Sequence, residues 1–461
     1  MGGKPGPFIA ACAAWFALGA PMPGVPGSGV PGSGVYTLGA RPAAAQAPAS
    51  GPAAAPDLAA PNPAASGPAA SGPAVSGPAV SGPVAPSPAT TVEIPYVAFQ
   101  VKRRLPQSFL DQPPEDEGVQ GARLALADNQ TTGRFLGQTY LLGEAVRTDA
   151  DAVLDAVRGR LAQGQRLFVA DLPAELLLRA ADLPEARGAV FLNATAEDDA
   201  LRGAHCRRNV LHLLPSRAML ADALMQYLAV KRWRNLLLVP GPTEADRAYA
   251  DALRRAARKF QMRVVADKPW TYERGARRTD TGHFSVAAEA ARFTQGLSYD
   301  VLVVADTAGE FGDDLAYRTT DPRPIAGTHG LVPTAWARPF EQWGATQLQA
   351  RFLRQAGRWM TPRDYGAWMA VRAIGEAASR TRSTDPARLA AYLRGPEFEL
   401  AAFKGSRLSF RPWDGQLRQP VLLADARALV SVSPQPGFLH QRSELDTLGI
   451  DEPETQCRPP S

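Results

Sequence analysis

Beyond residue 91 the chain alternates between two patterns of apolar and polar residues. Short apolar runs with the length and β-branched content of buried strands occur at residues 94–99, 140–142, 166–170, 236–239, 263–266 and 300–306. Between them, apolar residues recur every three or four positions, as at Val153, Val157 and Leu161, which is the spacing of an amphipathic helix. Apolar strands that alternate with such helices are typical of parallel sheets covered on both faces. We therefore predict an α/β fold with doubly wound parallel sheets.

The predicted helices begin and end at residues suited to those positions. Four helix starts carry a side chain that can accept a hydrogen bond from backbone N–H: Asp149, Thr243, Thr361 and Asp385. Residues 114–117 (PEDE) are expected to form the first turn of a helix, and Asn129 and Gly133 are expected to end it. The pattern continues for roughly 350 residues, which exceeds what one sheet normally organises, so we expect two lobes.

The beginning of the chain has a different character. Residues 8–20 form an apolar run that is shorter than the roughly 20 residues of a membrane-spanning helix and is typical of a signal-peptide core. Ala45 and Ala47 offer small residues for cleavage, so we interpret residues 1–47 as a leader. Residues 48–91 are rich in Pro, Gly, Ala and Ser and are expected to form a disordered linker. The sequence thus predicts export with cleavage of a signal peptide.

Charge and composition narrow the classes of function. The formal net charge is +5, but basic residues alternate with Asp and Glu along the predicted helices, which indicates a mixed-charge surface and no nucleic-acid partner. The histidines lack metal-ligand spacing, and nucleotide-binding and nucleophile-elbow motifs are absent, so we predict no enzyme activity, no metal and no cofactor. Cys206 and Cys457 are the only cysteines beyond the leader, and the sequence leaves open whether they pair.

Three stretches carry a resemblance to a known family. Residues 118–129 (GVQGARLALADN) and 131–137 (TTGRFLG) are similar to the first helix and glycine turn of type I periplasmic solute-binding proteins of the branched-chain amino-acid-binding kind. Residues 405–416 (GSRLSFRPWDGQ) are similar to the late hairpin of that family, and the order of elements resembles it over residues 92–440. The resemblance implies the substrate-binding component of an ABC transporter, which delivers a small-molecule ligand to an ABC permease in the inner membrane.

The same resemblance implies how the chain is divided. The positions that match the three crossings between lobes, which form a hinge, lie near residues 213–216, near residues 331–336 and after Lys404. The implied parts are a first lobe of residues 92–214 and 333–404, a second lobe of residues 215–332 and 405–440, and a tail of residues 441–461. A ligand in the cleft between such lobes acts by stabilising the closed state.

A narrower resemblance concerns residues 122–138. These residues are similar to a subfamily of binding proteins found with PQQ-dependent alcohol oxidation systems. The resemblance implies a periplasmic location, a ligand linked to that metabolism and a quinoprotein dehydrogenase system as a further partner. An alternative remains open, in which the protein is a periplasmic sensor or accessory protein of a quinoprotein alcohol dehydrogenase system without transport.

Candidate ligand-binding residues follow the predicted strands, because parallel α/β sheets bind ligands at the carboxyl ends of their strands. The candidates are Asp171, Asn193, Thr195, Thr243, Asp306, Thr307, Glu310, His329 and Trp336. Glu310 matches the acidic partner of the ligand ammonium in amino-acid-binding relatives, although it can equally favour the dipole of the next helix. His329 can instead bond to local backbone. Trp336 follows a predicted crossing, where it can form a cleft wall for an aromatic alcohol or its oxidation product.

One departure from the family bears on the ligand. Amino-acid-binding relatives have a Ser/Thr-rich loop after the third strand, whereas this chain has residues 170–175 (ADLPAE), with two carboxylates. These carboxylates would repel an anionic group on the ligand. We therefore expect a neutral, cationic or metal-associated ligand.

Overall fold

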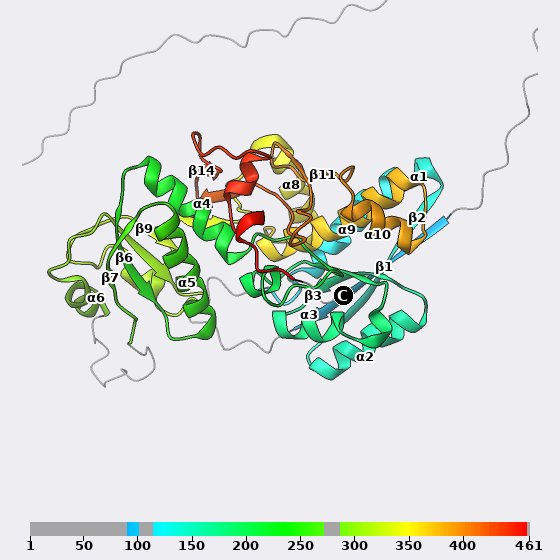
Figure 1. Ribbon diagram of the computed structural model, residues 1–461, viewed down its shortest axis with the longest axis horizontal. Helices are drawn as coiled ribbons and strands as arrows, with labels where there is room; N and C mark the ends of the chain where they lie inside the picture. Colours follow the sequence, from blue (N-terminus) through cyan, green and yellow to red (C-terminus); the bar gives the residue numbers. More distant parts are fainter. Residues whose placement is uncertain (1–89, 101–113, 272–285, 459–461) are drawn as a thin grey trace, which may run out of the picture. The chain divides into compact units, whose positions relative to one another are not determined.

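The computed structural model describes residues 90–100, 114–271 and 286–458 (Figure 1). The predicted leader and nearly all of the predicted linker lie outside these residues. The linker was predicted to end at residue 91, whereas Thr90 and Thr91 already belong to the first strand. No helix among the described residues is long and apolar enough to cross a membrane.

The first sheet has five parallel strands in the order β2-β1-β3-β4-β5. Its strands are β1 (Thr90–Phe99), β2 (Gln138–Arg147), β3 (Leu167–Asp171), β4 (Val190–Asn193) and β5 (Val210–His212). The helices of this part are α1 (Val119–Leu136), α2 (Ala150–Ala162), α3 (Ala174–Ala181), α8 (Ala345–Ala356), α9 (Pro362–Thr381) and α10 (Pro386–Arg394). One apolar cluster joins the sheet to α1 and α9, and a separate cluster joins it to α2 and α3. Two separate clusters are what a doubly wound sheet requires, because both of its faces are buried.

The second sheet has four parallel strands in the order β7-β6-β8-β9. Its strands are β6 (Asn235–Pro240), β7 (Arg263–Asp267), β8 (Val301–Ala305) and β9 (Ile325–Gly327). The accompanying helices are α4 (Arg217–Val230), α5 (Glu244–Lys259), α6 (Val286–Thr294) and α7 (Gly312–Leu315). Again two apolar clusters form, one with α4 and α5 and one that includes Trp270 stacked on Phe311. The predicted α/β fold with two parallel sheets is therefore confirmed.

The chain runs between the two sheets through segments that pack on one another. It leaves the first sheet between β5 and α4, returns through β10 (Val332–Thr334) before α8, and passes again between β12 (Arg407–Leu408), which pairs with β11 (Leu400–Ala401), and β13 (Val421–Ala424). The Gln416 side chain donates to the Leu214 carbonyl at 2.9 Å, and buried Lys404 donates to Gln419 at 2.9 Å. β13 pairs antiparallel with β10 and with β14 (Leu429–Ser433). The lobe boundaries drawn from the sequence stay a prediction.

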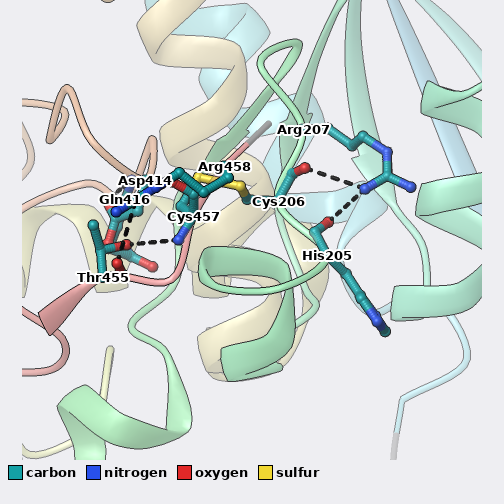
Figure 2. The surroundings of a disulfide bond; sticks show 8 residues. All are labelled: His205, Cys206, Arg207, Asp414, Gln416, Thr455, Cys457 and Arg458. Carbon is teal, nitrogen blue, oxygen red and sulfur yellow. Dashed lines mark hydrogen bonds between the residues drawn. A yellow bond between two sulfur atoms is a disulfide. The ribbon is translucent and has the colours of Figure 1, made fainter. Parts of the chain in front are cut away.

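A disulfide links the C-terminal segment of the chain to the first sheet's part of the protein. Cys206, in the segment between β4 and β5, is bonded to Cys457, 251 residues later (Figure 2). Upstream of Cys457, Asp446 accepts hydrogen bonds from Arg411 and Arg418 at 2.8 and 2.9 Å. This disulfide decides the pairing that the sequence left open.

Four predicted helix starts are those of the structure, whereas residues 114–117, predicted as the first turn of a helix, lie before α1, which begins at Val119. One predicted helix end is also wrong. Side chains of all four predicted caps accept backbone N–H groups at the starts of α2, α5, α9 and α10. By contrast, α1 continues past Asn129 and Gly133 to Leu136, and Gly137 in the left-handed conformation ends it. Asn129 is buried, and its side chain donates to the Val371 carbonyl of α9 at 2.9 Å. A residue type that often ends helices is here used for packing between helices.

Candidate functional site

A cavity of about 330 Å³ lies at the carboxyl ends of the second sheet's strands. We call it the strand-end cavity. The loops after β8 and β9 line it, together with β10, the first turn of α4 and Tyr249 in the second turn of α5. The loop after β4 and the start of α9 contribute Glu197 and Pro362. Larger cavities of about 620 and 530 Å³ lie along α8 and beside the disulfide. The strand-end cavity is the candidate site because parallel α/β sheets bind ligands at the carboxyl ends of their strands, and of these three cavities it is the one at such ends.

Asp306 shapes the loop after β8. Its two carboxylate oxygens accept the backbone N–H groups of Glu310, Phe311 and Gly312 at 2.7 to 2.9 Å. Its own N–H donates to the Thr328 hydroxyl at 2.9 Å, which ties this loop to the loop after β9. Asp306 lines the cavity, but its carboxylate is already satisfied by backbone. The main role of Asp306 is therefore to hold the conformation of this loop, and contact with a ligand is secondary.

His329 also lines the cavity, and one ring nitrogen is engaged. Its Nδ1 lies 2.9 Å from the Thr328 hydroxyl. Its Nε2 lies 3.9 Å from carboxylate oxygens of Asp306 and Asp313, which is beyond hydrogen-bond distance. A Cβ atom on Gly312 would overlap the imidazole ring, so this glycine leaves the space in which the ring sits. Nε2 is the ring nitrogen that remains for a ligand.

Asp246 of α5 holds two of the predicted site residues. Its Oδ1 accepts both the N–H and the hydroxyl of Thr307, at 2.6 and 2.7 Å, and its Oδ2 accepts the Thr243 N–H at 3.0 Å. Burial alone would raise the pKa of Asp246, but the hydrogen bonds from Thr243 and Thr307 outweigh it, so the pKa is lowered. Thr307 lines the cavity, whereas Thr243 caps α5. Sequence reasoning missed Asp246, although its position three residues after Thr243 is that of a capping box.

Asp171 is the centre of a buried cluster at the end of β3. Tyr96 donates to its Oδ2 at 2.6 Å, Arg363 Nε lies 2.7 and 3.0 Å from its two oxygens, and the Thr195 hydroxyl donates to Oδ1. Arg363 follows Pro362, which lines the cavity. Because Arg363 balances the charge of Asp171, the argument that Asp171 repels an anionic ligand loses its basis. Asp171 and Thr195 support the site from beside the cavity, outside its lining.

Three other predicted residues lie away from the cavity lining. Asn193 is buried, and its amide bonds to both the carbonyl and the N–H of Ala196, at 2.8 and 2.9 Å. Trp336 is 1% exposed and stacks on Tyr365 with ring centroids 4.4 Å apart. The expected cleft wall at Trp336 is therefore a core residue in the structure. Glu310 is absent from the lining, although its N–H is held by Asp306.

Glu197 is one of the lining residues that sequence reasoning missed, and Arg217 and Tyr249 are others. Glu197 follows Thr195 by two residues in the same loop after β4, which is the signal that pointed to it. Burial raises the pKa of the Glu197 carboxyl to about 7, although Arg217 and Arg202 act in the opposite direction. An acid with this pKa exchanges its proton near neutral pH. Perturbed acids in clefts are frequent at functional sites.

The comparisons with known proteins agree with this architecture. A family model described as periplasmic binding protein matches residues 112–428, which is more than half of the chain. The chain belongs to this family. Membership of this family indicates a periplasmic location. The chain also has the parallel-sheet lobes of type I periplasmic binding proteins. No curated protein matches the chain.

Several solved structures share the fold of this periplasmic binding protein. One from Burkholderia mallei, a periplasmic binding protein, has a TM-score of 0.57 and 14% identity, covering 80% of this chain and 99% of its own. An ABC transporter substrate-binding protein from Desulfitobacterium hafniense in complex with Leu has a TM-score of 0.57 and 17% identity, covering 73% and 98%. A solute-binding protein from R. palustris in complex with benzoate has a TM-score of 0.56 and 12% identity, covering 80% and 99%. At these identities the likeness shows the fold alone.

Among residues 90–100, 114–271 and 286–458, no three His, Cys, Asp or Glu side chains are grouped so that they can hold a metal ion.

Proposed function

We propose that this protein is the substrate-binding component of an ABC importer and binds a small molecule in the strand-end cavity. The observation that carries this proposal is the lining itself. Glu197 follows a strand of the first sheet, whereas Thr307 and His329 follow strands of the second. A ligand that contacts Glu197 as well as Thr307 or His329 stabilises the arrangement in which the residues from both sheets face one cavity. The names of similar structures, several of them ABC transporter proteins, support the same role.

The cavity favours a small polar ligand without negative charge. Its volume of about 330 Å³ is at the lower end for small-molecule sites. Of its two cationic candidates, Arg217 is already paired with Asp198 at 2.7 Å, and His329 is bound to a hydroxyl. Glu197 adds an acid to the lining. This balance of charges supports the expected neutral or cationic ligand, even though the original reason, repulsion by Asp171, does not hold.

The proposed metabolic context is PQQ-dependent alcohol oxidation. It rests on the resemblance of residues 122–138, which lie in α1 and run into β2, outside the lining of the cavity. The proposed partners are accordingly an ABC permease and, through shared metabolism, a quinoprotein dehydrogenase system. Alcohols and their oxidation products are the ligands to test first.

The proposal is tested by titration calorimetry of the purified protein with alcohols, aldehydes, carboxylates, amino acids and PQQ. We expect saturable binding of one chemical class, with one molecule bound per chain. Replacing His329 with alanine should weaken that binding, because His329 Nε2 lies at the cavity. His205→Ala is the matched control, since His205 is exposed and lies outside the lining. Binding that is absent for every class, or equal in the two variants, would contradict the proposal.

A further inference from the structure

Glu197 is an acid in the cavity lining whose carboxyl group is left without a partner. Its backbone carbonyl accepts the Arg217 N–H at 2.9 Å. In the part of the chain that the structure describes, its carboxyl group makes no hydrogen bond or ion pair. Glu197 is partly buried, and partial burial of a carboxyl group without a partner is unfavourable because water satisfies it less well than at the surface. Such a group indicates a ligand that supplies the missing hydrogen bond.

The cations nearest to Glu197 are committed elsewhere. Arg217 Nη1 pairs with Asp198 at 2.7 Å. Arg202 Nε donates to the Gln416 side chain and its Nη1 to the Ala196 carbonyl, both at 2.8 Å. These two arginines still attract the Glu197 carboxylate at longer range, but they do not satisfy it. The partner left for this carboxyl group is water or a molecule bound in the cavity.

The other titratable groups around Glu197 are acids, a phenol and an imidazole. Asp198 and Asp199 follow it in the same loop, and Asp199 accepts the N–H of Ala218 at 2.9 Å. Tyr249 of α5 is buried, and its burial together with the negative charge of Glu197 raises the pKa of its hydroxyl. From the loops after β8 and β9, Asp306 and His329 line the same cavity. The carboxylates among these groups disfavour a second negative charge beside Glu197.

We propose that Glu197 selects the ligand by accepting a hydrogen bond from an ammonium, N–H or O–H group of the molecule in the strand-end cavity. The inference rests on the proposed function and adds the chemical class of the substrate. It places the acidic recognition group after a strand of the first sheet, whereas the sequence had favoured Glu310 after a strand of the second. The preferred substrates are amines and alcohols, and carboxylates are disfavoured.

Protonation of Glu197 gives the proposal a pH signature. The carboxylate binds a cation only when it is ionised, and burial raises its pKa to about 7. The affinity for an amine probe should therefore rise as the pH rises from 6 to 8, approaching about tenfold per pH unit below the pKa. The affinity for the corresponding alcohol should change less, because a protonated carboxyl group still accepts a hydrogen bond at its carbonyl oxygen.

The probes are two matched series, butylamine with butanol and butyrate, and benzylamine with benzyl alcohol and benzoate. Within each series the apolar part is the same and only the polar group changes. Differences in affinity therefore measure which polar group Glu197 prefers. Calorimetry at pH 6, 7 and 8 on the full protein should rank the amine and the alcohol above the carboxylate. Glu197→Gln should lower amine affinity by about tenfold or more, since a charge-assisted hydrogen bond is lost, and should flatten its pH dependence.

Glu185→Gln is the matched control. Glu185 is exposed and precedes β4, whereas Glu197 follows that strand, so it lies at the opposite end of the sheet. The control should bind like the unmodified protein. A preference for carboxylates, or an amine preference that survives in Glu197→Gln, overturns the inference and leaves the proposed function standing. Absence of binding for all six probes and for the wider panel overturns both.

Discussion

Arg363 Nε lies 2.7 and 3.0 Å from the two carboxylate oxygens of Asp171, although the residues are 192 positions apart in the sequence. Asp171 ends β3, and Arg363 is the second residue of α9, which the chain reaches only after it has built the second sheet. Pro362, beside Arg363, lines the strand-end cavity. The pair therefore holds the start of α9 against the first sheet and fixes one wall of the candidate site.

Removal of Arg363 tests this role. In Arg363→Met the buried Asp171 carboxylate loses its counter-ion, and we expect the free energy of unfolding to fall by about 3–5 kcal/mol. Urea denaturation measures the change. The double variant Asp171→Asn/Arg363→Met should recover much of the loss, because no buried charge is left unpaired. A loss below about 1 kcal/mol in the single variant would mean that the pair is as weak as a surface ion pair.

Gly118 tests how closely the same cluster is packed. Its φ is +86°, and a Cβ atom there would overlap Asp171 Oδ2 and lie 2.7 Å from the Tyr96 hydroxyl. We expect Gly118→Ala to lower stability by about 3 kcal/mol or more, from backbone strain and overlap together. Gly188→Ala separates the two causes, since Gly188 has a φ of +78° with nothing within 4 Å of the added Cβ atom. That control should lose only about 1–2 kcal/mol. Equal losses would argue against the overlap.

Stability should depend on pH through Glu197. Burial raises its pKa from 4.5 to about 7, so between these pH values the folded protein holds a proton that the unfolded chain has lost. Proton binding by Glu197 therefore contributes to the free energy of unfolding; this contribution is complete below pH 4.5 and disappears as the pH rises through 7. Glu197→Gln should therefore gain stability relative to the unmodified protein between pH 5 and pH 8, by up to about 3 kcal/mol. Urea denaturation across this range measures the difference, and a difference that does not change with pH would place Glu197 in water.

The disulfide should stabilise the protein by restraining its end. Residues 446–449 are held by α4 and the third crossing segment, where Gly449 N–H donates to Asp222 at 2.9 Å and Asp446 accepts from Arg411. Cys457 then returns the chain to the loop before β5. Cys457→Ser should lower the free energy of unfolding by about 2–5 kcal/mol.

A cycle of serine variants identifies the cause. Cys206→Ser and the double variant should lose as much as Cys457→Ser, because each removes the same single bond. Additive losses would mean that the cysteines act by packing and not through the disulfide.

The sequence predicted what depends on local pattern. Asp149 and Thr361 could be recognised as caps because a cap needs only its own helix. The strand at residues 300–306 was recognisable because its residues are buried on both faces. Asn129 misled the prediction, since its role is a bond to a helix more than two hundred residues away.

The candidate site was less predictable, for the same physical reason. Loops after strands could be located, and His329 and Thr307 do line the cavity. Whether a polar group in such a loop is free or already bound depends on distant partners. The Asp171 carboxylate proved to be paired with Arg363, and the Thr307 hydroxyl with Asp246. Glu197 differs from them because burial raises the pKa of its carboxyl group and none of the described residues pairs with that group.

Hydrogen exchange with mass spectrometry locates the binding site most directly. The full protein is compared without ligand and with the probe that binds best in calorimetry. Binding in the strand-end cavity should slow exchange in residues 194–198, 306–311 and 328–334, because these loops line it or adjoin its lining. Protection confined to residues 338–359, along the cavity of about 620 Å³ beside α8, would contradict the proposed site.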